Sequence, residues 1–597
     1  SGGTLDFTTY NLSPSFVAEY QLLTPSPTAP FPTPVSGRGL FSLGENAVLS
    51  TAGLFTDDRL GTDSITGDPI QTAGGKVSIK SFSADLERGS RIDVSGSAYV
   101  SDKGEITYGN AGSISISSGN DPGFSGVTGG TLTLKSELLG YSGSKGGTLS
   151  IQAGLVRIGG TPVAGALNLR ENFFNKGGFN RFNLTGIGAR STATPPAGFT
   201  ETYEAAVSIA SGTRIRPVAS SLQAITKDNG DIVLERVTAE KGLRNAVSLS
   251  FTALGNDDLF TPDSLEIRGD VVMEAGASIV TDPGAGVSFK GGTVTLLGSV
   301  ITPGGSITLS GAGAFPLTSS QRASISQALP TVHIGDQALL SAAGAVVLKP
   351  DAFGRRTGNV LAGGTISVSG NILAEKGATL DVSGASGVLD LDAASLASTT
   401  TVLAGNGLTS APVRITGTPT RISSNGGVID LTGSQMLLTD ATLIGKAGGS
   451  GAIGGTLSVS SGRYYNSGER STGADINLIV RQSGDSIPIS VTNPGVGSFL
   501  TDGGGQPFGN LGYFSLDRFT DGSFNSLELG GKYITSGSSV PYGGNILFEG
   551  PVNLTVTGKL RLAAGGIIQT TDRVKISASY LSLKKNIMQP KNPNDNV

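Results

Sequence analysis

Short segments in which apolar and small polar residues alternate recur along the chain, and most begin after a pair of glycines. Residues 74–96 read GGKVSIKSFSADLERGSRIDVSG, and residues 363–384 read GGTISVSGNILAEKGATLDVSG. Both end in Asp-Val-Ser-Gly, almost three hundred residues apart. Alternation with a period of two predicts a short strand with one buried face. Similar starts occur at residues 2–5, 129–134, 146–151, 291–296, 304–309, 426–431 and 454–459.

The spacing of these segments predicts a repeated unit of about 20 to 23 residues, with one or two further short strands in each unit. Such short strands do not form a stable sheet on their own. Stacked one above another, each strand would pair with its copies on both sides and share a continuous core. We therefore expect an all-β fold, and specifically a parallel β-helix, or β-solenoid, with irregular excursions.

Breaks in this rhythm predict the organisation of the chain. Residues 24–34 (TPSPTAPFPTP) are rich in proline, which cannot donate to a strand ladder, so they predict an extended linker. Irregular turns and many aromatic residues predict two excursions. The expected order is an N-terminal strand and linker (1–36), solenoid turns (37–154), an excursion (155–260), solenoid turns (261–460), a second excursion (461–530), terminal solenoid turns (531–583) and a polar tail (584–597).

The two predicted excursions contain a second internal match. Residues 174–184 (FNKGGFNRFNL) align without a gap to residues 519–529 (FTDGSFNSLEL). The residues on either side do not follow the same offset convincingly. We therefore expect only that each excursion ends by re-entering the solenoid.

The amino-acid composition excludes several classes of protein and of binding site. Among 597 residues there are 91 glycines and no cysteine, and only 15% of the residues are charged. The low charge argues against disorder, and the lack of cysteine excludes disulfides and thiolate metal sites. The net charge is −4 with no long basic run, so we expect no nucleic-acid partner. No apolar run approaches the ~18 residues of a transmembrane helix.

Residues 332–387 resemble the filamentous haemagglutinin family of large exoproteins, as do GGFNRFNLTG (177–186) and IASGTRIRP (209–217). The resemblance covers most of the chain and implies a right-handed parallel β-helix. It also implies export from a Gram-negative bacterium by two-partner secretion through an outer-membrane pore. Members act as adhesins, biofilm factors or carriers of a C-terminal toxin, at the outer cell surface or outside the cell.

The chain departs from this family in two respects, one of which is that it contains no recognisable toxin module. The Asn-Pro-Asn pattern of the family's secretion domain is missing, and Asn493-Pro494-Gly495 is the nearest approach. The chain also begins at Ser1 without a signal peptide. We therefore expect a mid-fibre segment or a processed body of a longer protein.

Few residues predict catalytic chemistry. His333 is the one histidine, and we expect it to face solvent or lie at the end of a solenoid turn. Neither a Gly-x-Ser-x-Gly elbow nor a Walker A sequence occurs. Gly449–Gly454 satisfies G-x-G-x-x-G, but a strand-like segment follows where the dinucleotide fingerprint requires a helix. We expect no enzyme and no cofactor.

Two clusters of aspartates, one tripeptide and one pair of tyrosines remain as candidate sites. The clusters are Asp57, Asp58 and Asp63, and Asp257, Asp258 and Asp263; they predict solvated turns, with Ca²⁺ binding or polysaccharide cleavage as alternatives. Arg268-Gly269-Asp270 is the tripeptide that integrins read, and its place between two strands predicts a corner that exposes it. It is a candidate receptor contact, with a purely structural corner as the alternative. Tyr464 and Tyr465 are candidates for a glycan or subunit contact, or for covering an apolar patch.

Together these observations predict a non-enzymatic structural protein. We expect the body of a β-helical fibre or adhesin, whose partners are other copies of itself or neighbouring segments of a longer fibre. Unpaired strand edges at the two ends would allow end-to-end assembly. Cell-surface glycans or receptors are further possible partners, and the alternative function is a carbohydrate-binding or polysaccharide-cleaving β-helix.

Overall fold

The protein is described here from a computed structural model of the whole chain. Its fold is all-β, with a few short helical segments and a large parallel sheet. The residues that the structure describes are 2–23, 32–59, 73–195, 199, 201–257, 265–313, 315, 328–349, 351–352, 354–391, 417–463, 477–487, 495–498, 500–501, 512–530, 542–543, 545–564 and 567–585.

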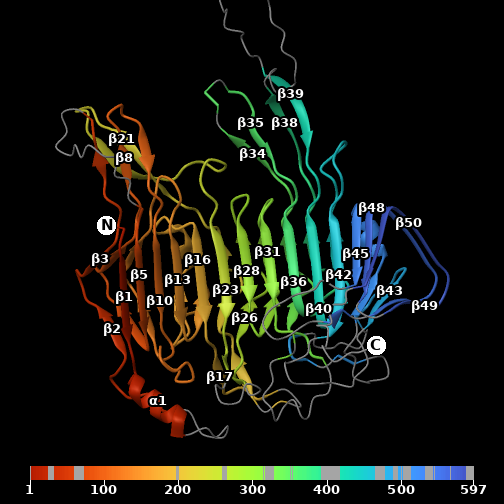
Figure 1. Cartoon of the computed structure of the whole chain (residues 1–597), viewed down its shortest axis with the longest axis horizontal. Coiled ribbons are helices and arrows are strands. Elements are labelled where there is room, and N and C mark those ends of the chain that lie inside the picture. Colours follow the sequence, from red (N-terminus) through yellow and green to blue (C-terminus); the bar gives the residue numbers. More distant parts are fainter. Residues whose placement is uncertain are drawn as a thin grey trace, which may run out of the picture.

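One stack of parallel strands, the first stack, runs through the whole described chain, and its strands lie side by side in order of sequence (Figure 1). Neighbouring strands pair in register, so that Leu5 lies opposite Val77 and Val77 lies opposite Ile114. The stack consists of β1 (Thr4–Thr9), β5 (Lys76–Ser81), β10 (Ser113–Ser117), β13 (Thr148–Ala153), β16 (Arg181–Gly186), β23 (Ser248–Ala253), β28 (Gly286–Lys290), β31 (Ser306–Ser310), the first half of β36 (Thr365–Ala374), the first half of β40 (Val428–Thr439), β42 (Thr456–Arg463), β45 (Ser526–Gly530), and the second halves of β48 (Val552–Ala564) and β50 (Val574–Lys585).

Two further stacks, the second and the third, contain the strands that follow each strand of the first. The second consists of β2 (Leu40–Leu43), β6 (Ser83–Leu86) and β11 (Leu132–Leu134), then β15 (Leu167–Leu169), β14 (Val156–Ile158), β19 (Val207–Ile209), β26 (Asp270–Met273), β29 (Thr293–Leu296), β32 (Val332–Ile334), the ends of β36 and β40, β44 (Gly512–Ser515), β43 (Asn477–Arg481), β47 (Asn545–Phe548) and β49 (Ile568–Thr570). The third consists of β3 (Val48–Ser50), β7 (Arg91–Asp93) and β12 (Glu137–Leu139), then β20 (Arg214–Ile215), β27 (Ser278–Val280), β30 (Ser299–Ile301), β33 (Leu339–Ser341), β37 (Thr379–Asp381) and β41 (Thr442–Ile444).

The alternation in the sequence explains the core. Because successive side chains of a strand point to opposite faces, in-register pairing lines up equivalent residues along the stack. Ile307, Ile366 and Ile429 follow one another in one such row, and all three are fully buried. One continuous apolar cluster extends from Leu43 to Ala564. The prediction of an all-β fold with a large parallel sheet is thus confirmed.

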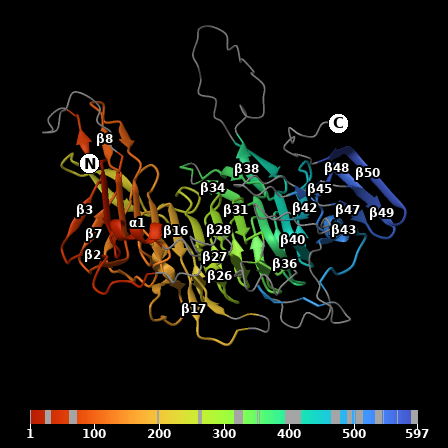
Figure 2. The ribbon, with the colours of Figure 1, turned by 60° about the horizontal axis from the view of Figure 1, so that its bottom comes forward.

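Antiparallel hairpins leave the stacks at the sides. The hairpins that contain β8 and β38 project from one side of the molecule and the one that contains β17 from the opposite side, in both views (Figures 1 and 2). Their strands are β8 (Ala98–Val100) with β9 (Ile106–Tyr108), β17 (Ala189–Ser191) with β18 (Thr202–Glu204), β21 (Ser221–Thr226) with β22 (Ile232–Val237), β24 (Asn256–Asp257) with β25 (Leu265–Ile267), β34 (Val346–Lys349) with β35 (Thr357–Val360), and β38 (Ser386–Leu391) with β39 (Thr418–Ser423). Two short strands lie beside longer ones, β4 (Thr56–Asp57) along β8 and β46 (Tyr542–Gly543) along β42.

The N-terminal segment contains a helix that the sequence analysis did not predict. Within residues 1–36, expected to hold a strand and a linker, α1 spans Pro14–Leu23. Ser13 caps it, because its Oγ accepts the N–H of Phe16 at 3.2 Å, and Pro14 occupies the first turn, where no N–H is needed. The pair Ser13-Pro14 is therefore the local signal for this helix.

The two matching sequence segments belong to one structural module that occurs twice. In each copy, a strand of the second stack (β14 or β43) is followed along the chain by a strand (β15 or β44) that lies on its N-terminal side in the stack. A short helical segment, η1 (Glu171–Asn175) or α3 (Asp517–Asp521), then leads back to the first stack. Residues 155–260 and 461–530 therefore contribute strands to the stacks, and the reversed strand and the hairpins are what interrupt the repeat.

Backbone hydrogen bonds show that the two copies are equivalent. The N–H of Asn180 donates to the carbonyl oxygen of Gly147 at 2.9 Å, and the N–H of Asn525 donates to that of Gly455 at 2.8 Å. These bonds attach the turn after each helical segment to the Gly-Gly start of the preceding strand in the first stack. The sequence match at residues 174–184 and 519–529 thus reflects a shared three-dimensional arrangement.

A buried phenylalanine in each copy requires a glycine beneath it. Phe179 packs against Gly140, and Phe524 packs against Gly445. A Cβ atom at either glycine would overlap the phenylalanine ring, well inside van der Waals contact. The Phe524 ring is only 6% exposed, so it has little free space into which to move.

We expect Gly445→Ala to destabilise the protein by about 1 to 3 kcal/mol, since an added methyl group in a close-packed interior displaces the Phe524 ring. The shift of the unfolding midpoint in a denaturant titration of the whole chain measures this effect. Gly44→Ala is the matched control, because a Cβ there meets no atom within 4 Å. Equal midpoints for the two variants would contradict the packing described for the module.

Candidate functional site

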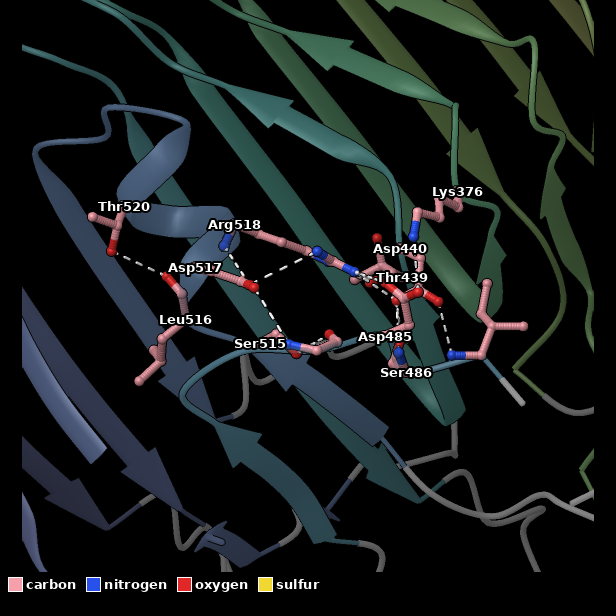
Figure 3. Close-up of polar contacts among 12 residues, drawn as sticks. Lys376, Thr439, Asp440, Asp485, Ser486, Ser515, Leu516, Asp517, Arg518 and Thr520 are labelled. Atoms are coloured by element: carbon pink, nitrogen blue, oxygen red, sulfur yellow. Dashed lines mark hydrogen bonds and ion pairs between the residues drawn. The ribbon is translucent and has the colours of Figure 1, made fainter. Parts of the chain in front are cut away.

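A buried cluster of charged residues joins α3 to the second stack (Figure 3). Arg518, on α3, places Nη2 2.7 Å from Oδ1 of Asp440, and its Nε donates to the carbonyl oxygen of Thr439 at 2.9 Å. The side chains of Arg518 and Asp440 are 13% and 3% exposed. Thr439 ends β40 and Asp440 follows it, so the guanidinium group clamps the helical segment onto the end of that strand.

Asp440 also anchors the segment that precedes β44. Its Oδ1 accepts the N–H and the Oγ–H of Ser486, at 2.7 and 2.9 Å, and its Oδ2 accepts the N–H of Ile487 at 2.9 Å. These contacts hold the chain that leads into the reversed strand.

A second, more exposed link extends the cluster. Nζ of Lys376 lies 3.0 Å from Oδ2 of Asp485, and Nη2 of Arg518 lies 3.5 Å from Oδ1 of Asp485. The hydrogen bond from Lys376 lowers the pKa of Asp485, despite a smaller opposing effect of burial. Because these carboxylates are paired with cations or backbone N–H groups, the cluster is suited to fastening segments together. Within the part of the chain that the structure describes, no group of three or more His, Asp or Glu side chains is arranged to hold a metal ion.

The tripeptide Arg268-Gly269-Asp270 follows β25 directly, and its Asp270 is the first residue of β26, at the predicted corner. Nε and Nη2 of Arg268 contact the two carboxylate oxygens of Asp270 at 2.7 and 2.8 Å. Oγ1 of Thr293 donates to the same carboxylate at 2.7 Å, and Asp270 is only 5% exposed. The guanidinium group also lies over the ring of Tyr203, 5.1 Å from its centre. The exposure expected of a corner is therefore not found at Asp270, and a receptor would have to displace these internal contacts.

Of the two acidic clusters, the first is partly described. Asp57 is bound by its neighbour Arg59, with Nη2 2.7 Å and Nε 3.2 Å from Oδ2. This side-chain hydrogen bond lowers the pKa of Asp57. Asp63, Asp258 and Asp263 lie outside the described residues, as do the side chain of Asp257 and both Tyr464 and Tyr465.

His333 does not face solvent, contrary to the sequence-based expectation. It lies in the middle of β32, is 5% exposed, and pairs in the stack with Thr295 and Leu373. Its Nε2 contacts the carboxylate of Glu375, which follows the end of β36. Leu373, its neighbour in the stack, packs with Leu500 in a separate apolar cluster on this outward face of the second stack. Sequence periodicity does not reveal this second cluster.

The glycine motif Gly449–Gly454 forms a turn, and β42 follows it. The helix that a dinucleotide site requires is absent at this position, as the sequence predicted. No helix among the described residues is long and apolar enough to cross a membrane.

Comparisons with known proteins give no family for the chain. No protein-family model, no curated protein and no solved structure matches it. Functional inference therefore rests on the geometry of the chain itself.

Arg518 and Asp440 were not singled out by their sequence. They lie 78 residues apart, and neither belongs to a recognisable motif. The only signal is indirect, since Arg518 occupies the place in the second module that Phe173 occupies in the first.

We expect Arg518→Met to destabilise the protein by about 3 to 5 kcal/mol, because it leaves the carboxylate of Asp440 buried without its cation. Lys376→Met is the control, since Lys376 is 76% exposed and its ion pair contributes no more than about 1 kcal/mol. Denaturant unfolding of both variants measures the difference. The double variant Arg518→Met with Asp440→Asn also removes the buried negative charge. We expect it to recover part of the lost free energy of unfolding. Similar effects of the two single substitutions would show that Arg518 is no anchor.

The lowered pKa of Asp485 predicts a weak dependence of stability on pH. A carboxyl group whose pKa is lower in the folded state stabilises the fold above its unfolded pKa, about 3.9, and loses this contribution as the pH falls through the folded pKa. We therefore expect Asp485→Asn to lower the melting temperature slightly near pH 6 and to match the parent protein near pH 2. A difference that stays constant over this range would exclude the ion pair as its source.

Proposed function

We propose that the chain is a right-handed parallel β-helix that serves as a structural rod, the body of a fibre or adhesin. One observation carries this proposal. Two rows of inward-facing apolar residues continue without interruption along the first stack, from Leu5 and Phe7 in β1 to Leu581 and Leu583 in β50. A repeated ladder of this kind gives length and stiffness, since every added strand satisfies the backbone of the strand before it.

The two ends of these rows support assembly end to end. Leu581 and Leu583 are 48% and 64% exposed, although their counterparts in β48 are buried. At the other end, Leu5 and Phe7 are only partly buried. Among the described residues, β1 and β50 are edge strands of the first stack, and exposed apolar side chains on an edge strand favour pairing with another strand.

A second copy of the chain fits this end in register. If β1 of one copy continues the stack of another after β50, Leu5 follows Leu581 and Phe7 follows Leu583, which extends both rows without a shift. The match relies on the same pairing that joins Leu560 to Leu581 within the chain. We infer that copies join head to tail, and that the assembled rod works outside the cell, at the surface of a Gram-negative bacterium or in its matrix.

The pairing of the buried and half-buried carboxylates supports the hypothesis that the function is structural and not catalytic. Asp440, Asp485, Asp270 and Asp57 are each bound to a cation of the chain itself. General acid–base or metal-assisted cleavage of a polysaccharide needs carboxyl groups that are available to substrate. The resemblance to secreted β-helical exoproteins favours the same conclusion.

Electron microscopy of the purified protein over a concentration series tests this proposal. We expect filaments whose axial repeat is close to the length of one rod, and we expect Leu583→Lys to prevent them by placing a charge in the joint. Leu348→Lys is the control, because Leu348 is also about half exposed, at 47%, but lies on the side hairpin β34–β35.

Rods that never join at any concentration would contradict self-assembly. Compact particles without an elongated body would contradict the rod itself.

A further inference from the structure

The apolar core is incompletely covered at three places, and only two of them are ends. Partly buried apolar residues that pack on the core occur in the first strands of the chain and in β50. The third group, Leu132, Leu134 and Phe173, lies in the interior of the sequence, at the first copy of the repeated module. Core residues exposed at this point require an explanation, because the neighbouring strands continue on both sides.

The second stack is interrupted at this place. β11 pairs with β6, and β15 pairs with β14, but among the described residues no backbone pairing joins β11 to β15. In the second copy of the module the equivalent strands do meet, since Leu437 and Leu438 of β40 pair with Gly512 and Tyr513 of β44. The first copy is thus open where the second is closed.

Side chains at equivalent positions account for this difference. In the second copy, Arg518 on the helical segment binds Asp440, which follows β40. Extending the gap-free alignment by one residue towards the N-terminus places Phe173 where Arg518 lies, and counting back five residues from Gly140 and Gly445 places Lys135 where Asp440 lies. An aromatic ring and an ammonium group therefore replace the ion pair, and they cannot form the same clamp.

A cavity of about 540 Å³ lies beside this interruption, between the end of β11, β12 and the segment that contains η1. Its apolar wall includes Leu134, Phe173, Phe179 and Phe182, and its polar wall includes Lys135 and Lys176. The size lies within the range of small-molecule sites in proteins.

The charge of the polar wall favours an anion. Glu137 also lines the cavity, but its carboxylate lies 3.7 Å from Nη1 of Arg236 and is thereby partly neutralised. No ion pair is found for Lys135 or Lys176 within the described part of the chain. Two ammonium groups beside an apolar wall offer both halves of a site for an amphiphilic anion.

We propose that this cavity binds a small amphiphilic monocarboxylate, an alkyl or aryl carboxylic acid. Its apolar body lies against Phe173 and Leu134 and covers the exposed part of the core. Its carboxylate accepts hydrogen bonds from Lys135 or Lys176. The ligand thus supplies the contact that Arg518 and Asp440 supply in the second copy.

Isothermal titration of the whole chain with decanoate tests the site. The double variant Phe173→Arg with Lys135→Asp transfers the closed arrangement of the second module to the first, and we expect it to abolish binding of decanoate. Leu348→Lys, on the side hairpin β34–β35, is the control and is expected to leave binding unchanged. Decanol, which lacks the charge, is expected to bind about tenfold more weakly than decanoate, as the loss of a charge-assisted hydrogen bond predicts.

Three results would overturn the proposal. They are unchanged decanoate binding in the double variant, decanol binding as tightly as decanoate, and no heat of binding with decanoate at concentrations up to about 5 mM. If the double variant does not fold, Lys135→Met with Lys176→Met preserves the apolar wall. That variant must then weaken decanoate binding and leave decanol binding unchanged for the proposal to stand.

Discussion

The structure depends on the in-register parallel pairing of short strands. A strand of three to six residues gains little from its own contacts, but its N–H and C=O groups are satisfied when an equivalent strand lies on each side. The same pairing aligns the inward side chains, so that Ile307, Ile366 and Ile429 form one row. Backbone satisfaction and core packing therefore impose the same requirement on the sequence, and repetition follows from it.

Where this pairing fails, other interactions must replace it, and these places are where function is expected. At the ends of the first stack, Leu581 and Leu583 have core partners on one side only. At the second module, the chain reverses its order in the second stack, and the buried pair of Arg518 and Asp440 holds the reversed strand. At the first module, the stack stays open beside Phe173. Elsewhere among the described residues, the first stack repeats the same in-register pairing from strand to strand.

Much of this fold could be predicted from the sequence because the period-two pattern is local. Most Gly-Gly starts mark strands of the first stack, although those at 129–130 and 291–292 precede β11 and β29 of the second. Residues 174–184 and 519–529 do reveal a repeated module. The reversal of strand order could not be predicted, because β15 has the same alternation whichever side of β14 it pairs with. The Arg518–Asp440 anchor joins residues that no pattern connects, and His333 is buried although its strand neighbours Val332 and Ile334 are the residues that face the core. These contacts join residues that are far apart in the sequence, so they leave no periodic pattern in it.

In the two modules, the path of the chain and the closure of the corner are determined by different groups. Asn180 and Asn525 make the same backbone contacts, and Gly140 and Gly445 lie under equivalent rings, so the path of the chain is fixed by groups that the two copies share. The position held by Phe173 or Arg518 is not needed for that path, because the turn forms with either residue. It is therefore free to determine whether the corner is closed by an ion pair or left open to solvent. A duplicated element of this kind keeps its fold through the shared residues, and one copy can take on a binding role while the other remains an internal fastening.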